Sequence, residues 1–219
     1  MIKNGSCSGL IKNKDLAKKI IEATRKGAGD LPVSVKTRLG FETPDMGWIE
    51  FLLRQELPVL TIHLRTVYEM SKVDAHWEYI HEIISLRDKI SPQTIIIGNG
   101  DIKSVEDIKA KYNKYHNEGF MAGTGIFSNP WIFNPKVNIE DVRVKEKLGL
   151  YLKHIKLFQK TWGKAKNPAI IKKFCKMYIQ GFPGASELRA ELMKENSLDQ
   201  FQEILKIYKI NQKLPCLIR

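Results

Sequence analysis

The sequence contains few cysteines and no long apolar run. Its three cysteines, Cys7, Cys175 and Cys216, lie far apart and form no Cys-x-x-Cys pair. This spacing argues against a disulfide framework or a zinc knuckle and fits a reducing compartment. No apolar stretch reaches the ~20 residues that a membrane span needs, and residues 1–5 lack the apolar core of a signal peptide. We therefore expect a cytoplasmic protein with no membrane partner.

Acidic residues are scarce relative to basic ones. The 219 residues include 24 Asp+Glu and 36 Lys+Arg, which gives a formal net charge of +12. Most of the excess lies in residues 151–219, which hold 14 Lys+Arg and 5 Asp+Glu, and residues 151–180 hold eight lysines and no acid. A basic face of this kind favours a polyanionic partner, because it neutralises phosphates.

Aromatic residues are interleaved with these lysines: Tyr151, Phe158, Trp162, Phe174 and Tyr178. Such side chains can stack on unpaired bases of RNA. The other interpretation is a solvated amphipathic helix whose aromatic residues lie in a core, and spacing alone slightly favours it. The two interpretations are compatible, since the aromatic residues can form the core while the lysines bind phosphate.

Short β-rich runs alternate with helical patterns in the first part of the chain. The runs are 31–37, 59–63, 94–97 and 119–122, and the helical patterns are 15–25, 48–55, 76–86 and 104–112. Asn13 and Ser104 are the expected N-caps of the first and last of these helices. Alternation at this spacing is typical of βα units, so we expect a parallel sheet.

From about residue 144 the sequence lacks β-branched runs and its pattern is helical throughout. We expect helices at 145–162, 167–180, 185–194 and 198–208. The best domain boundary falls within residues 134–141. We therefore predict an α/β domain in residues 1–140 and an all-α domain in residues 141–219.

Each predicted strand ends in polar residues or glycines. The first strand ends in Lys36 with Arg38 and Gly40, and the second ends in His63 with Arg65. The third ends in Asn99-Gly100-Asp101 and the fourth in Gly123-Thr124-Gly125. The carboxyl ends of parallel barrel strands share one face, and that face carries the active site in barrel enzymes. Each group alone is more often structural, but four such ends together indicate a functional site.

The polar groups suit a phosphorylated flavin. Lys36 and His63 can stabilise negative charge on a redox ring, and Asn99 and Asp101 can bind a ribityl chain or a ring edge. The glycine-flanked loop at 123–125 leaves N–H groups open for a phosphate. The sequence has no Ser/His/Asp order, no GxSxG and no HExxH, and its histidines show no metal-ligand spacing. A hydrolase or metal site is therefore disfavoured.

Several segments resemble motifs of the tRNA-dihydrouridine synthases. The strand segments are 32–40 (PVSVKTRLG), 60–66 (LTIHLRT), 97–102 (IGNGDI) and 119–133 (GFMAGTGIFSNPWIF). The segment 172–189, which contains Lys-Lys-Phe and GFPGA, is similar to the family's C-terminal RNA-binding segment. The order and spacing of these motifs agree across almost the whole chain.

The resemblance implies an oxidoreductase that reduces uridine to 5,6-dihydrouridine in tRNA, with FMN as cofactor and NADPH as reductant. It also implies a (β/α)8 TIM barrel followed by a helical domain. The cofactor-binding residues carried over from the family are Lys36, His63, Asn99, Gly100, Asp101, Gly123 and Thr124. The candidate tRNA contacts are Arg65, Lys172, Lys173 and Arg189.

The chain departs from the family pattern at three places. Thr124 stands where the family has arginine, and the loss of a charge-assisted contact worth roughly 1.5–3 kcal/mol predicts weaker FMN binding. Leu64 stands where the family often has a small residue. The four recognisable strands correspond to the last four of the barrel. The family's catalytic cysteine lies just upstream of the segment that matches residues 3–10, and Cys7 aligns with a small residue instead.

We therefore expect an N-terminally truncated synthase, or one half of a split gene, with no catalytic residue of its own. Half a barrel exposes unpaired strand edges and one open core face. Such a chain should be marginally stable and aggregation-prone alone, and a partner chain or a second copy would complete the barrel. One alternative is a non-catalytic tRNA-binding remnant. Another, a different FMN barrel enzyme such as a dihydroorotate dehydrogenase-like protein, is disfavoured by the basic helical tail.

Overall fold

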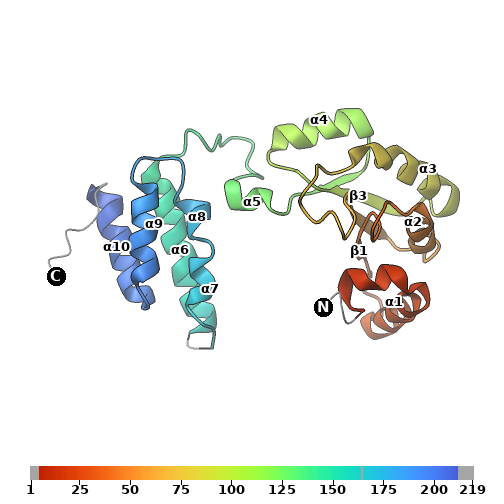
Figure 1. Cartoon of the computed structure of the whole chain (residues 1–219), viewed down its shortest axis with the longest axis horizontal. Helices are drawn as coiled ribbons and strands as arrows, with labels where there is room; N and C mark the ends of the chain where they lie inside the picture. Colours follow the sequence, from red (N-terminus) through yellow and green to blue (C-terminus); the bar gives the residue numbers. More distant parts are fainter. Residues whose placement is uncertain (1–4, 164, 212–219) are drawn as a thin grey trace. The chain divides into compact units, whose positions relative to one another are not determined.

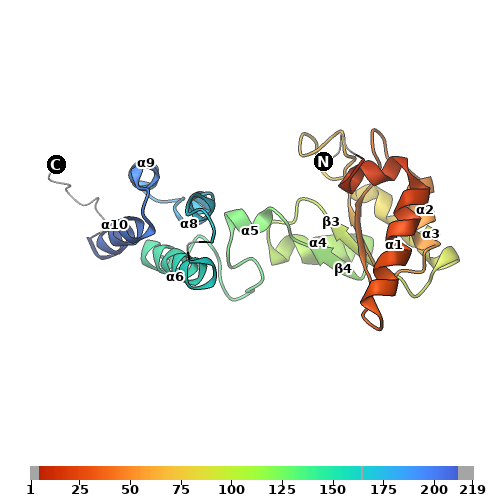
Figure 2. The same ribbon diagram turned by 90° about the horizontal axis from the view of Figure 1, so that it is seen from below.

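The computed structural model describes residues 5–163 and 165–211 of the chain. They belong to two compact units, Met1–Gly125 and Ile126–Arg219 (Figures 1 and 2). The units divide at Gly125, whereas the sequence pattern favours a boundary within residues 134–141. Among the described residues, no helix has the length and hydropathy needed to cross a membrane.

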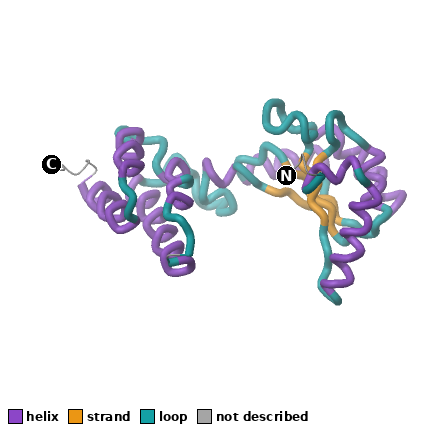
Figure 3. Tube along the Cα trace, turned by 60° about the horizontal axis from the view of Figure 1, so that its bottom comes forward, coloured by secondary structure: helices purple, strands orange, loops and turns teal. Residues whose placement is uncertain are grey.

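The first unit is built on a parallel sheet of four strands. These are β1 (Val35–Arg38), β2 (Val59–His63), β3 (Ile95–Asn99) and β4 (Gly119–Met121), paired in the order β1-β2-β3-β4. Figure 3 shows the strands, in orange, lying together among helices. The helices are η2 (Cys7–Lys12), α1 (Lys14–Ala28), α2 (Met46–Leu53), η3 (Trp77–Tyr79), α3 (Ile80–Ile90) and α4 (Val105–Tyr115), of which η2 and η3 are 3₁₀ helices. This α/β arrangement is consistent with part of a TIM barrel.

Local sequence signals determine where two of these helices begin. The Asn13 side chain accepts a hydrogen bond from the N–H of Leu16 at 3.0 Å and caps α1. The Ser104 hydroxyl accepts one from the N–H of Asp107 at 3.1 Å and caps α4. Both bonds satisfy N–H groups that a helix start leaves without partners. The two predicted caps are therefore confirmed.

Strand β1 begins at Val35, so the prediction of a strand from residue 31 is wrong. The register pairs Val35 with Leu60, next to the first residue of β2. Residues 31–34 consequently have almost no strand alongside them, and Pro32 has no N–H to donate. Leu31 is 73% exposed.

The core of the first unit lies between the sheet and helices α2 and α3. Leu60 and Ile62 of β2 are fully buried, and so are Ile80 and Ile83, which lie three residues apart on one face of α3. Burial of these aliphatic side chains holds the sheet in place and fixes the positions of its strand ends.

The second unit contains helices and loops in its described residues. The helices are α6 (Val144–Trp162), α7 (Ala169–Lys172), α8 (Cys175–Tyr178), α9 (Ala185–Lys194) and α10 (Leu198–Asn211), and the short α5 (Gly125–Ser128) starts at the end of the first unit. Helices α6 and α10 pack against each other. Tyr151, Phe158 and Tyr178 are buried, while Trp162 is 47% exposed. The core interpretation of the aromatic residues is thus confirmed for these three.

The single helix predicted at 167–180 is wrong, because the chain breaks between α7 and α8. The hydroxyl of Tyr151 donates to the carbonyl oxygen of Ile171 at 3.0 Å, and the N–H of Phe174 binds the same oxygen at 3.2 Å. An unbroken α-helix would give that oxygen to the N–H of Cys175. The break therefore occurs where Tyr151 of α6, which is distant along the chain, contacts the carbonyl oxygen of Ile171.

Candidate functional site

Polar side chains meet at the carboxyl ends of the strands. The register aligns Arg38 of β1 with His63 of β2, His63 with Asn99 of β3, and Asn99 with Met121 of β4. Residues paired laterally point to the same face of a sheet, and so do residues two apart in one strand. Lys36 therefore shares the face of Arg38, and the structure brings Lys36, His63 and Asn99 together.

Arg38 belongs to this row, and the sequence analysis placed it at a strand end without assigning it a ligand. Its Nη1 donates to the carbonyl oxygen of Thr66 at 2.8 Å and links β1 to the loop after β2. Burial and the charge of Arg65 lower the pKa of Arg38, and Glu69 opposes them. The sequence indicates that Arg38 lies on the same face as Lys36, because residues two positions apart in a strand point to the same side of the sheet.

His63 is neutral at neutral pH. Burial lowers the pKa of its imidazole to about 4, and the charges of Arg38, Lys36 and Arg65 act in the same direction. Asp101 opposes this effect but is outweighed. Burial lowers the pKa of Lys36 as well, and the positive charge of Arg38 lowers it further. A neutral imidazole donates one hydrogen bond and accepts another, so His63 can hold a polar ligand without adding charge.

Arg65 is buried beside His63. Its side chain is 9% exposed, and its Nη2 donates to both carboxylate oxygens of Asp101, at 2.6 and 2.7 Å. Burial favours a higher pKa for Asp101, but the hydrogen bonds from Arg65 and from the N–H of Ala75 outweigh it and lower the pKa. The sequence analysis gave Arg65 to tRNA and Asp101 to the cofactor, and the structure pairs them with each other.

Asn99 and the loop after β4 form the other side of the row. Nδ2 of Asn99 donates to the carbonyl oxygen of Met121 at 2.6 Å. Gly123 and Thr124 are exposed, and a Cβ added at Gly123 would meet only Nδ2 of Asn99, at 3.8 Å. The loop therefore leaves open space beside a buried amide.

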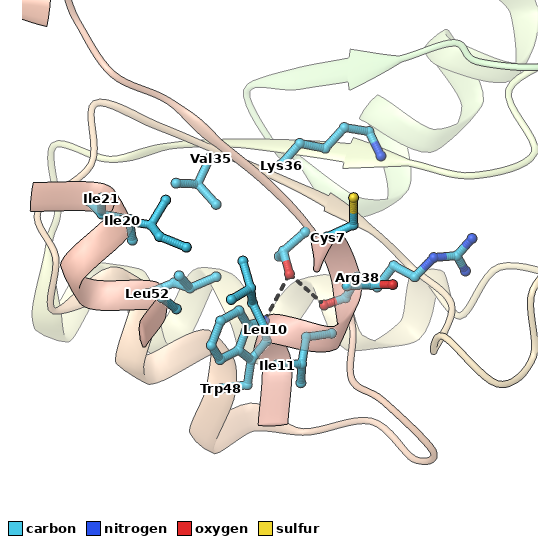
Figure 4. Close-up of a pocket in the computed structure, with 13 residues that line it drawn as sticks. Cys7, Leu10, Ile11, Ile20, Ile21, Val35, Lys36, Arg38, Trp48 and Leu52 are labelled. Atoms are coloured by element: carbon cyan, nitrogen blue, oxygen red, sulfur yellow. Dashed lines mark hydrogen bonds between the residues drawn. The ribbon is translucent and has the colours of Figure 1, made fainter. Parts of the chain in front are cut away.

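An apolar groove of about 420 Å³ adjoins β1 (Figure 4). Its apolar lining includes Leu10, Ile20, Ile21, Val35, Trp48 and Leu52. Figure 4 shows the charged ends of Lys36 and Arg38 at one end of the groove, away from Ile20 and Ile21. The sequence pattern did not predict this groove, because it depends on how η2 and α1 pack against β1 and α2.

The loop after β2 is closed by hydrogen bonds around His76. Nε2 of His76 lies 2.8 Å from Oε1 of Glu69, and Nδ1 lies 3.0 Å from Oε1 of Glu78. The bond with Glu69 raises the pKa of His76, and the bond with Glu78 adds to this despite partial burial. Burial favours a higher pKa for Glu69, but hydrogen bonds from Thr66 and His76 lower it overall.

We expect His76 to stabilise the fold at low pH. Its folded pKa lies above its unfolded value, so its contribution is complete below pH ~6.5 and is lost as the pH rises through the folded pKa. Urea unfolding of His76→Gln should therefore show a larger loss of unfolding free energy at pH 5.5 than at pH 8.5. His81→Gln, at an exposed position of α3, is the control. An equal loss for His76→Gln at both pH values would contradict the assignment.

The three basic residues of the second unit that were predicted to contact tRNA differ in their surroundings. Lys172 donates to the carbonyl oxygens of Met193 and Glu195, and Arg189 donates to that of Ile179 at 2.6 Å. Lys173 is exposed, and none of the described residues pairs with its ammonium group. Of the three, Lys173 has the side chain most open to an anionic partner.

The sequence model of the dihydrouridine synthase (Dus) family matches residues 1–214. A "Probable tRNA-dihydrouridine synthase" of Staphylococcus epidermidis is 43% identical over 209 residues, which cover 94% of this chain and 63% of that protein. One from Staphylococcus aureus is 43% identical over 206 residues, covering 93% and 62%. A "Probable tRNA-dihydrouridine synthase 2" of Bacillus subtilis is 42% identical over 207 residues, covering 92% and 62%.

The chain thus spans somewhat less than two thirds of the length of these relatives. The similarity includes the strand ends that carry Lys36, His63 and Asn99, since the family match extends over both units. A match of this extent establishes membership. The chain belongs to the dihydrouridine synthase family.

Proposed function

We propose that this protein acts in the reduction of uridine to 5,6-dihydrouridine in tRNA, with FMN as cofactor and NADPH as reductant. The observation that carries the proposal is the row of Lys36, His63 and Asn99 at the strand ends of a family member. FMN, when bound, supplies the hydride chemistry, and the protein supplies binding and orientation. The donors at the site fit a ligand that carries negative charge, because Lys36, Arg38 and His63 share one face of the sheet.

Asn99 provides a test of whether the site fits a flavin. The residue is 8% exposed, and its Nδ2 is bonded to the protein, but its Oδ1 accepts no hydrogen bond from any described residue. This oxygen is not among the fully buried polar atoms of the described residues that lack a partner, so it stays accessible to a ligand or to water. A ring N–H or a ribityl hydroxyl is a suitable donor, so the residues present fit FMN.

The loop of Gly123 and Thr124 is proposed to hold the FMN phosphate. The Thr124 side chain offers a hydroxyl where the family pattern has a guanidinium. Thr124→Arg should therefore tighten FMN binding roughly 10- to 100-fold, because a charge-assisted contact contributes about 1.5–3 kcal/mol. Binding of riboflavin, which lacks the phosphate, is the control and should change little. Equal gains for both ligands would show that the loop does not hold the phosphate.

The second unit is proposed to bind tRNA through Lys172, Lys173 and Arg189, whereas Arg65 of the first unit, which the sequence analysis also gave to tRNA, is buried and paired with Asp101. The exposure of Lys173 makes it the sharpest test. Lys173→Gln should weaken tRNA binding and reduce the slope of log K against log [salt] by about 1, as expected for one lost phosphate contact. Lys206→Gln, at a lysine paired with Glu203 on α10, is the matched control. Unchanged slopes for both variants would refute the assignment of Lys173.

We further propose that a partner chain or a second copy completes the site. In the described residues β1 pairs with β2 alone. A strand edge left open in this way favours pairing with another chain. Light scattering after gel filtration tests the proposal: self-association or aggregation is expected for the chain alone, and a stable monomer that unfolds cooperatively would count against it.

Dihydrouridine formation is the test of the proposed activity. Unmodified tRNA incubated with FMN, NADPH and the protein together with the partner chain proposed above should gain 2 Da at one uridine by mass spectrometry, and His63→Gln in this chain should reduce the yield. The second candidate is a tRNA-binding remnant without flavin chemistry, favoured by the concentration of lysines in residues 151–180. A protein that shifts tRNA on a gel but takes up no flavin would support the remnant.

A further inference from the structure

We propose that Arg65 and Asp101 are positioning residues for His63, which hold its imidazole in the neutral tautomer that carries the proton on Nδ1. This deepens the proposed function and rests on it for the role of His63 as a flavin contact. The tautomer itself depends only on the geometry of the flavin-free chain, so it can be tested separately.

The tautomer follows from which atoms of the pair can donate. Nη1 of Arg65 lies 3.3 Å from Nε2 of His63. A guanidinium carries only N–H donors and keeps its charge in proteins, so it cannot accept a hydrogen bond. Nε2 must therefore be the acceptor. In a neutral imidazole with Nε2 unprotonated, the proton is on Nδ1.

Arg65 is held in this orientation by three further hydrogen bonds. Its Nη2 donates to Oδ1 and Oδ2 of Asp101 at 2.6 and 2.7 Å, and its Nε donates to the carbonyl oxygen of Val73 at 2.6 Å. Asp101 is fixed in turn by the N–H of Ala75, which donates to Oδ2 at 2.8 Å. A guanidinium bound on both edges cannot rotate away from the imidazole without breaking a charged pair.

The ring of His63 is also confined from the side of Gly100. A Cβ added at Gly100 would lie 3.5 Å from Cδ2 of His63 and 2.6 Å from Cβ of Ala75. The indole Nε1 of Trp77 donates to the carbonyl oxygen of Gly100 at 3.0 Å and fixes this backbone. The imidazole therefore lies close to the backbone of Gly100.

Burial and the charges around His63 together keep the ring neutral. Lys36 and Arg38 face it from β1, Arg65 from the segment after β2, and Asp101 from the segment after β3. Three cations outweigh one carboxylate, and the carboxylate is itself bonded to Arg65. Asp101 thus acts on His63 mainly through Arg65, as a positioning residue.

His63 therefore offers a ligand one hydrogen-bond donor, whose direction is fixed by the orientation of the ring. Nε2 of His63 is occupied by Arg65, and no described residue bonds to Nδ1. Nδ1–H is therefore the group that His63 can offer to an acceptor at the strand ends. Because the ring stays neutral across physiological pH, this hydrogen bond does not depend on a proton taken from solution.

Long-range ¹H–¹⁵N correlation spectra of the full chain, labelled with ¹⁵N-histidine and free of flavin, test the proposal directly. The chain has five histidines, and the signals of His63 are identified by their loss in His63→Gln. At pH 7 we expect the pattern of an Nδ1-protonated neutral ring. An Nε2-protonated ring or an imidazolium at pH 7 would overturn the proposal.

Two variants separate positioning from general stabilisation. Arg65→Leu should shift the His63 pattern toward the Nε2-protonated tautomer and raise its pKa, because one donor and one cation are removed. Arg54→Leu removes an exposed arginine that pairs with Glu50 and should leave the His63 spectrum unchanged. If Arg65→Leu unfolds the chain, the spectrum of the wild-type protein still shows which tautomer His63 adopts. FMN uptake is measured independently, so failure of the proposed function would leave the tautomer result readable.

Discussion

Replacing Tyr151 with alanine is expected to destabilise the helical unit by about 3–5 kcal/mol. The ring is fully buried, and it stacks on Tyr178 at a centroid distance of 4.6 Å and meets Phe201 edge-on at 5.7 Å. Its hydroxyl donates to the carbonyl oxygen of Ile171. Alanine removes the ring contacts and leaves a cavity, and it also removes one of the two hydrogen bonds to the carbonyl oxygen of Ile171 at the break between α7 and α8. Urea unfolding followed by far-ultraviolet circular dichroism measures the loss.

Two substitutions on α6 provide controls for Tyr151→Ala. Tyr151→Phe keeps the ring and loses one hydrogen bond, so a loss of about 0.5–1.5 kcal/mol is expected. Leu157→Ala alters a residue that is 62% exposed, and its effect should stay within about 0.5 kcal/mol. If Tyr151→Ala unfolds at the same urea concentration as Leu157→Ala, the stacked aromatic core does not stabilise this unit.

Replacing Gly100 with alanine is expected to destabilise the first unit by about 2–4 kcal/mol and to abolish FMN binding. Gly100 has φ +135°, which side-chain-bearing residues rarely adopt, and a Cβ would lie 2.6 Å from that of Ala75. Relief of this clash requires the segment that carries Ala75 to move. Asp101 and Arg65 would move with it, because Asp101 is bonded to the N–H of Ala75.

Gly27→Ala is the matched control, with an expected effect of opposite sign. Gly27 lies in α1, and a Cβ there would meet no atom within 4 Å. Alanine should therefore stabilise the unit by about 0.5–1 kcal/mol, because glycine loses more backbone entropy in a helix. Urea unfolding measures the difference in stability between Gly100→Ala and Gly27→Ala, and FMN titration measures their difference in FMN affinity. A Gly100→Ala variant that is as stable as wild type and binds FMN would contradict the described role of this turn.

Local patterns predicted the elements whose determinants are local. The caps at Asn13 and Ser104 depend on residues three positions apart, and β2 was predicted at residues 59–63, where it lies. The break between α7 and α8 was missed because it involves Tyr151, twenty residues before Ile171 along the chain. The start of β1 was missed because it depends on the register with β2.

The same distinction applies to the candidate site. Strand ends can be read from the sequence, so Lys36, His63 and Asn99 were placed on one face before the register was known. The pairing of Arg65 with Asp101 joins residues 36 positions apart, and no local pattern reports such a contact. Their residue types suggested tRNA and cofactor contacts, whereas the structure shows that each is the other's partner.

The central claim is that the strand ends bind a phosphorylated flavin, and the most direct measurement is FMN uptake by the purified protein. After dialysis against FMN or riboflavin, the visible absorbance spectrum should show retained FMN and much less riboflavin. NADPH should then bleach the FMN absorbance in the absence of oxygen. A protein that remains colourless after dialysis against FMN, while its circular dichroism shows a folded chain, would contradict the account.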